Sequence, residues 1–118
     1  MIADRVRETT TSTSTTAITL SGAVTQFQSF ANAFGSNPNT RVTYAIVGQG
    51  TTEWEVGAGT FNGTTGLTRE LVYSSSNSNA LTNFSAGTKD VYCTAPSIII
   101  ANGTFGCIIA NARGLAML

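Results

Sequence analysis

The stretch Glu53-Trp54-Glu55-Val56-Gly57-Ala58-Gly59-Thr60-Phe61 decides how the rest of the chain is interpreted. Acidic and apolar residues alternate at its start, and successive side chains of a β-strand point to opposite faces. The alternation predicts a strand in which Trp54 and Val56 point into a core. Glu53 and Glu55 are then expected on the opposite face, in water.

Strands are also predicted on both sides of this stretch. Residues 41–47 are apolar on both faces, as in the central strand of a sheet. The Asn62-Gly63 dipeptide suits a hairpin turn because both residues accept a positive φ. Residues 67–73 are expected to return as the partner strand, with Arg69 and Glu70 exposed. The predicted core comprises Val42, Tyr44, Ile46, Trp54, Val56, Val91 and Cys93.

Two further local features bear on the fold. Gly57 and Gly59 are expected to permit a β-bulge or the close approach of another backbone. In residues 24–34, three phenylalanines lie at helical spacing among residues that suit a strand. We predict a strand there that runs into one irregular or helical turn.

Short, evenly spaced strands with glycine turns predict an all-β fold, namely a small antiparallel β-sandwich or a barrel-like module. A chain of 118 residues fits one such domain. We expect an extended N-terminal arm at residues 1–16, a β-rich core module at 17–96 and a C-terminal hairpin or tail at 97–118. The apolar C-terminal segment is expected to pack on the core or on a neighbouring subunit.

Residues 9–16 form an unbroken run of threonine and serine, which favours extended backbone because threonine is β-branched. One interpretation is a flexible leader. The other is an arm that pairs with an open sheet edge of a partner subunit. The predicted partner contacts are Thr9, Thr10, Thr11, Ile108, Ile109, Leu115, Met117 and Leu118.

The charge content of the chain is low and balanced. Charged residues make up 10% of the sequence, and six basic and six acidic residues give a formal net charge of zero. A binder of nucleic acid or of an anionic membrane would need a long-range positive field, so neither partner is expected. Proteins without net charge tend to associate, which suits a subunit of an assembly.

The sequence contains no histidine, so a Ser-His or Cys-His nucleophile cannot be built within it. Glu53 and Glu55 could form a carboxylate pair or bind calcium. We instead interpret the two glutamates as the solvent-facing side of an amphipathic strand. Arg69 or Lys89 would be their surface partners on neighbouring strands. We therefore predict no catalytic, metal-binding or cofactor-binding residues, and a protein that is not an enzyme.

Cys93 and Cys107 are the only cysteines, and their spacing matches no zinc motif. Both lie in apolar surroundings, where a cysteine usually behaves as a small buried hydrophobe. We expect two free, buried thiols. A disulfide between them is the alternative.

Five motifs within the first 96 residues together resemble a small module of structural proteins from tailed bacteriophages. They are Asp4-Arg5-Val6-Arg7-Glu8-Thr9-Thr10, Gly22-Ala23-Val24-Thr25, Glu53-Trp54-Glu55-Val56-Gly57, Ser75-Ser76-Asn77-Ser78 and Asn83-Phe84-Ser85-Ala86-Gly87-Thr88-Lys89-Asp90-Val91-Tyr92. No family motif follows Pro96.

The resemblance implies a virion protein that assembles in the host cytoplasm, without enzymatic activity and often as a homotrimer. We expect a capsid cement or decoration protein whose partner is the major capsid protein or another virion protein. A tail adaptor or fibre-base (head-binding) protein is the first alternative. A carbohydrate-binding module is the second, because the neutral polar surface would suit a glycan if Trp54 were exposed.

Overall fold

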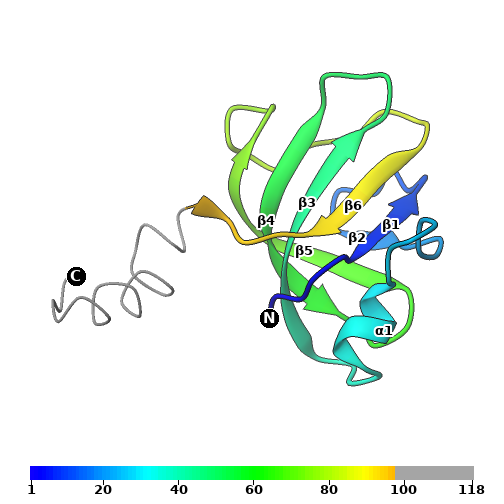
Figure 1. Cartoon of the computed structure of the whole chain (residues 1–118). Coiled ribbons are helices and arrows are strands. Elements are labelled where there is room, and N and C mark those ends of the chain that lie inside the picture. Colours follow the sequence, from blue (N-terminus) through cyan, green and yellow to red (C-terminus); the bar gives the residue numbers. More distant parts are fainter. Residues whose placement is uncertain (98–118) are drawn as a thin grey trace, which may run out of the picture.

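Six antiparallel strands form one sheet in the order β1-β6-β3-β4-β5-β2. This architecture comes from a computed structural model that describes residues 1–97. The elements are β1 (Arg7–Thr10), β2 (Ala17–Thr19), α1 (Phe30–Phe34), β3 (Thr40–Gly48), β4 (Trp54–Phe61), β5 (Gly66–Ser75) and β6 (Lys89–Cys93). The predicted all-β class is confirmed (Figure 1).

The sheet curls so that its two end strands approach each other. The chain that follows β2 runs past β1, where Ser21 N donates to Thr9 O at 2.8 Å and Val24 N donates to Arg7 O at 3.0 Å. Full closure removes the open edges of a sheet. These bonds join β1 to the chain that follows β2, so the molecule is a nearly closed barrel, one of the two predicted forms.

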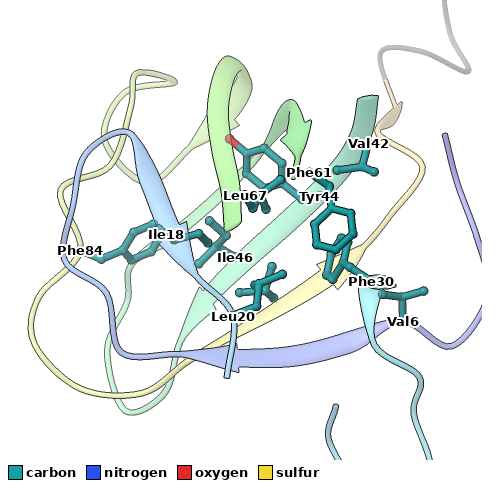
Figure 2. Packing of buried hydrophobic residues seen from close by; sticks show 11 residues of the cluster. Val6, Ile18, Leu20, Phe30, Val42, Tyr44, Ile46, Phe61, Leu67 and Phe84 are labelled. Carbon is teal, nitrogen blue, oxygen red and sulfur yellow. The ribbon is translucent and has the colours of Figure 1, made fainter. Parts of the chain in front are cut away.

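Strand β3 is central, as predicted, because β6 and β4 pair with it on either side. Its even-numbered residues point into the barrel, where Val42, Tyr44 and Ile46 are buried, so this part of the predicted core is confirmed. Val91 on β6 is buried as well. The labelled core residues in Figure 2 are Val6, Ile18, Leu20, Phe30, Val42, Tyr44, Ile46, Phe61, Leu67 and Phe84.

Helix α1 contributes Phe30 to this core. The phenyl ring of Phe30 packs against Phe61 of β4, with 5.8 Å between ring centroids. Ser29 caps the helix by accepting a hydrogen bond from Asn32 N at 3.0 Å. The predicted helical turn is therefore confirmed. The strand predicted before it is wrong, since residues 24–28 lie outside the strands and make only isolated backbone bonds to Arg5 and Arg7.

Glycines 57 and 59 lie at the two irregularities of the β4–β5 pair, as predicted. The register shifts between Val56 and Gly57 and again between Ala58 and Gly59. A Cβ atom at Gly59 would lie 2.0 Å from the carbonyl oxygen of Thr68, and one at Gly57 would lie 2.3 Å from that of Leu71. Only glycine fits this close approach of two backbones.

The prediction that residues 1–16 form an extended arm outside the core module is wrong. Residues Arg7–Thr10 form β1 and pair with β6 of the same chain, so the core module begins before residue 17. Glu8 explains the difference, because its buried carboxylate accepts hydrogen bonds from Gly22 N at 2.9 Å and Phe30 N at 2.8 Å. A carboxylate with buried backbone donors holds the strand in its own barrel.

We predict that Gly59→Ala destabilises the protein by about 1–3 kcal/mol, because the added methyl group has no room beside the β5 backbone. Urea unfolding measures the change. Thr68→Ala, at an exposed side chain of the neighbouring strand, is the control and should shift stability by less than about 0.5 kcal/mol. Equal stability of Gly59→Ala and the parent would contradict this account of the bulge.

Candidate functional site

A buried ion pair lies inside the barrel between β4 and β5. Glu55 Oε1 is 3.0 Å from Arg69 Nη1, and both side chains are fully buried. The hydroxyl of Tyr44 donates to Glu55 Oε2 at 2.7 Å, and the amide of Thr82 donates to Oε1 at 2.7 Å. Burial and the bond to Glu55 raise the pKa of Tyr44. The tyrosine hydroxyl therefore stays protonated and donates a hydrogen bond to the carboxylate.

Arg69 also joins loops to the barrel wall. Its Nη1 donates to Thr82 O at 3.0 Å, and its Nη2 donates to Ser14 O. The guanidinium carbon lies 5.5 Å from the centroid of the Phe84 ring, a cation–π distance. One side chain thus holds the loop before β2 and the loop before β6 against the same strand.

The buried ion pair shows that the predicted orientation of β4 is wrong. Alternation holds, but Glu55 faces inward, so Trp54 is 40% exposed and Val56 is half-buried on the outer side. The prediction of Trp54 as a core residue is wrong because Glu55 finds Arg69 and Tyr44 as partners inside. Arg69 was expected as a surface partner, and it is instead buried.

The turned-out residues create an apolar surface on the outside of β3, β4 and β5. Val47, Trp54 and Leu71 are 41%, 40% and 46% exposed. Val47 is directly opposite Trp54 in the register of β3 and β4. We call these three residues, together with the half-buried Val56 and Tyr73, the outer face. Large exposed apolar side chains grouped on one surface are typical of an interaction site.

A cleft of about 240 Å³ adjoins the outer face. Strands β4 and β5 line it with Val56, Tyr73 and Ser74, and residues 94–97 form the remaining wall. Because β3 separates β6 from β4 in the sheet, the chain after β6 must cross the outside of β3 to reach this cleft.

A second cleft of about 240 Å³ lies at the end of β4 and is polar. Its lining residues are Glu53, Ser76, Asn77, Thr82 and Asn83. The carboxylate of Glu53 accepts hydrogen bonds from Ser85 N at 2.9 Å and from Ser85 Oγ at 2.8 Å. These bonds lower the pKa of Glu53. Within residues 1–97, no three His, Cys, Asp or Glu side chains gather as a metal site would require.

The threonines predicted to contact a partner differ in their accessibility. Thr10 is buried and its hydroxyl donates to Thr19 O at 2.6 Å, so it is not available to a partner and that prediction is wrong. Thr9 is half-buried in β1 and Thr11 is exposed, so their contacts remain predictions. The other predicted contacts, Ile108, Ile109, Leu115, Met117 and Leu118, lie outside the described residues, as does the predicted C-terminal hairpin.

Cys93 is half-buried against the core, and its sulfur accepts a hydrogen bond from Ala3 N at 3.3 Å. Burial raises the pKa of this thiol. Such a thiol is a poor nucleophile, because the reactive form is the thiolate. Cys107 lies outside the described residues, so the pairing of the two cysteines stays a prediction.

No protein family, no curated protein and no solved structure matches this chain. Among residues 1–97, no helix is long and apolar enough to cross a membrane.

We predict that Arg69→Met destabilises the protein by about 3–5 kcal/mol, because it leaves the carboxylate of Glu55 buried without its cation. The matched control is Arg41→Met, which removes an exposed pair with Glu70 and should cost less than about 1 kcal/mol. Urea unfolding of both variants measures the difference. Equal losses would show that Arg69 is not buried.

The hydrogen bonds that Glu53 accepts in the polar cleft make the stability of the protein depend on pH. The pKa of Glu53 is lowered in the folded protein, so between the folded and unfolded pKa values the unfolded chain binds more protons. The stabilisation is therefore complete above the ordinary glutamate pKa of about 4.3 and is lost as the pH falls through the folded value. Urea unfolding of the parent and Glu53→Gln at several pH values should give curves that converge in acid. Parallel curves would contradict the role of Ser85.

Proposed function

We propose that this protein is a non-enzymatic structural subunit of a tailed-phage virion, acting as a capsid cement or decoration protein. In this role it stabilises contacts between major capsid subunits. The outer face carries the proposal, because it places exposed apolar residues on three neighbouring strands of a protein that has few charged residues. The resemblance of five sequence motifs to phage virion modules is the reason for proposing a virion as the assembly.

The chemistry of the outer face suits a protein partner. Trp54 lies opposite Val47 across the sheet, and tryptophan is among the residues that contribute most to interface affinity. The strands beneath it belong to a nearly closed barrel whose interior is filled by side chains. Such a support holds the apolar residues in place before binding, which reduces the entropy lost on association.

A tail adaptor or fibre-base protein would use the same surface, so position in the particle separates the two roles. A map of virions, or gold labelling of an epitope tag on the protein, tests the proposal. We expect density or label over the capsid shell, at sites between capsid subunits. Label confined to tails would favour the adaptor, and absence from virions would overturn both roles. A homotrimer is the expected oligomer, and light scattering that gives a monomer at high concentration would contradict it.

A carbohydrate-binding module is a second candidate, and one observation favours it. The indole of Trp54 is exposed, and an exposed aromatic ring is a suitable platform for a sugar. Binding of the parent, but not of folded Trp54→Ala, to a glycan array would support this function over the capsid role.

We predict that Trp54→Ser weakens binding to purified capsids at least about tenfold, as loss of a central interface aromatic does. The matched control is Ile2→Ser, since Ile2 is 39% exposed but lies outside the outer face. Co-sedimentation with capsids measures the affinities, and thermal melts check folding. Equal binding by both variants would remove the outer face from the proposed interface.

A further inference from the structure

The polar cleft at the end of β4 has a carboxylate in its wall and no basic group among the described residues that line it. All of its lining residues are polar, and Glu53 is the charged one. The two hydrogen bonds from Ser85 lower the pKa of Glu53, so the carboxylate is ionised at neutral pH. Each carboxylate oxygen accepts one of these bonds and has a further lone pair. The cleft therefore presents a negative charge with spare acceptors.

Glu53 belongs to none of the ion pairs within residues 1–97. Lys89 acts on it through space, but the ammonium of Lys89 is buried and donates to Ser12 O at 2.9 Å. The chain has six acidic residues, and arginine side chains already pair with three of the others, namely Glu55, Glu70 and Asp90. The charge of Glu53 is thus available to a cation from outside the chain.

Two asparagines add neutral acceptors to the cleft. Asn77 Nδ2 donates to Leu81 O at 2.9 Å, and no donor within residues 1–97 reaches Asn77 Oδ1. Asn83 is exposed, and its side-chain amide makes no hydrogen bond within the same residues. A guanidinium has five N–H donors in a planar fork and no acceptor. It therefore matches a carboxylate that has amide oxygens beside it.

The loop between β5 and β6 holds the wall of the cleft in place. Ser78 and Asn79 have positive φ angles of 55° and 63°, which are uncommon for residues other than glycine. Asn79 Oδ1 accepts a hydrogen bond from Ser75 N at 3.1 Å, and Thr82 N donates to the buried carboxylate of Glu55 at 2.7 Å. A wall that is ordered before binding reduces the entropy lost when a ligand enters.

The polar cleft adjoins the outer face through the main chain of Trp54. Ser76 Oγ accepts a hydrogen bond from Trp54 N at 3.0 Å, and Thr82 Oγ1 donates to Trp54 O at 3.3 Å. Protein interfaces commonly have an apolar centre and a polar rim, and they are enriched in arginine and depleted in lysine. The cleft thus lies where the rim of an interface on the outer face would be.

We propose that the polar cleft binds the guanidinium of an arginine side chain from a protein partner, with Glu53 as its counter-ion. The charge and the acceptors of the cleft favour the guanidinium, and the neighbouring outer face favours a protein as its source. The choice of a protein rests on the proposed function, whereas binding of the guanidinium does not. A paired arginine would also orient the partner, because its fork meets a carboxylate in a defined geometry.

Titration of the full-length protein with N-acetyl-arginine amide, followed by NMR, tests the proposal. N-acetyl-citrulline amide is the matched control compound, since its urea group resembles the guanidinium in shape but carries no charge. We expect the arginine compound to shift the amide signals of Ser76, Asn77 and Asn83 with a Kd on the order of 10 mM. The citrulline compound should leave them unchanged. Equal shifts from both compounds, or no saturable shift from the arginine compound, would overturn the proposal without bearing on the location of the protein in virions.

Two variants show whether Glu53 is the counter-ion. Glu53→Gln keeps the size of the side chain and should weaken binding of the arginine compound at least about fivefold, because a charge-assisted pair is lost. Asp4→Asn is the matched control, since Asp4 is an exposed carboxylate outside the cleft, and it should bind like the parent. Thermal melts check folding. Equal weakening in both variants would reduce the effect to net charge and would overturn the proposal.

Glucose, titrated into the parent in the same way, tests the other chemistry that polar side chains can recognise. We expect no saturable shift of the cleft signals. Saturable shifts with glucose and none with the arginine compound would make the cleft a sugar site and would overturn the proposal.

Discussion

The orientation of β4, and with it the surface that the protein presents, depends on the buried ion pair of Glu55 and Arg69. Breaking such a pair is costly because one charge remains without a partner, whereas the intact pair adds little net stability. Arg69 Nε also lacks a hydrogen-bond partner among the described residues. We infer that the pair serves to select one arrangement. A β4 strand turned over would bury Trp54 and expose Glu55, and Arg69 would then lose its carboxylate.

Two buried cations also explain why the threonine-rich run belongs to the barrel. Arg69 donates to the carbonyl of Ser14, and Lys89 Nζ donates to that of Ser12 at 2.9 Å. Burial lowers the pKa of Lys89, so holding its charge here has a cost that the bond to the loop offsets in part. With the loop between β1 and β2 held in this way, partner contacts are better sought on the outer face.

Local sequence signals predicted much of the fold. Residues 41–47 are apolar on both faces and form the central strand, and the Asn62-Gly63 turn joins β4 to β5. The sequence could not predict which side of β4 faces the barrel interior. Alternation allows two orientations, and hydropathy favours the wrong one because it places Trp54 inside and Glu55 outside. Only the distant partners Arg69 and Tyr44 decide between them. No prediction was made for Leu71. The register shift between Ala58 and Gly59 places Leu71 on the outer side although Arg69, two residues before it, points inward.

The central claim is that the charge of Arg69 lies inside the barrel. Exchange of guanidinium protons with water, followed by NMR of the unmodified protein, tests it most directly. The side chain of Arg41, which is 54% exposed, provides the internal reference. The structure predicts slowly exchanging protons on Arg69, with cross-peaks to the ring of Tyr44 or Phe84, and fast exchange on Arg41. Equally fast exchange on both arginines would contradict the buried pair and the orientation of β4 that follows from it.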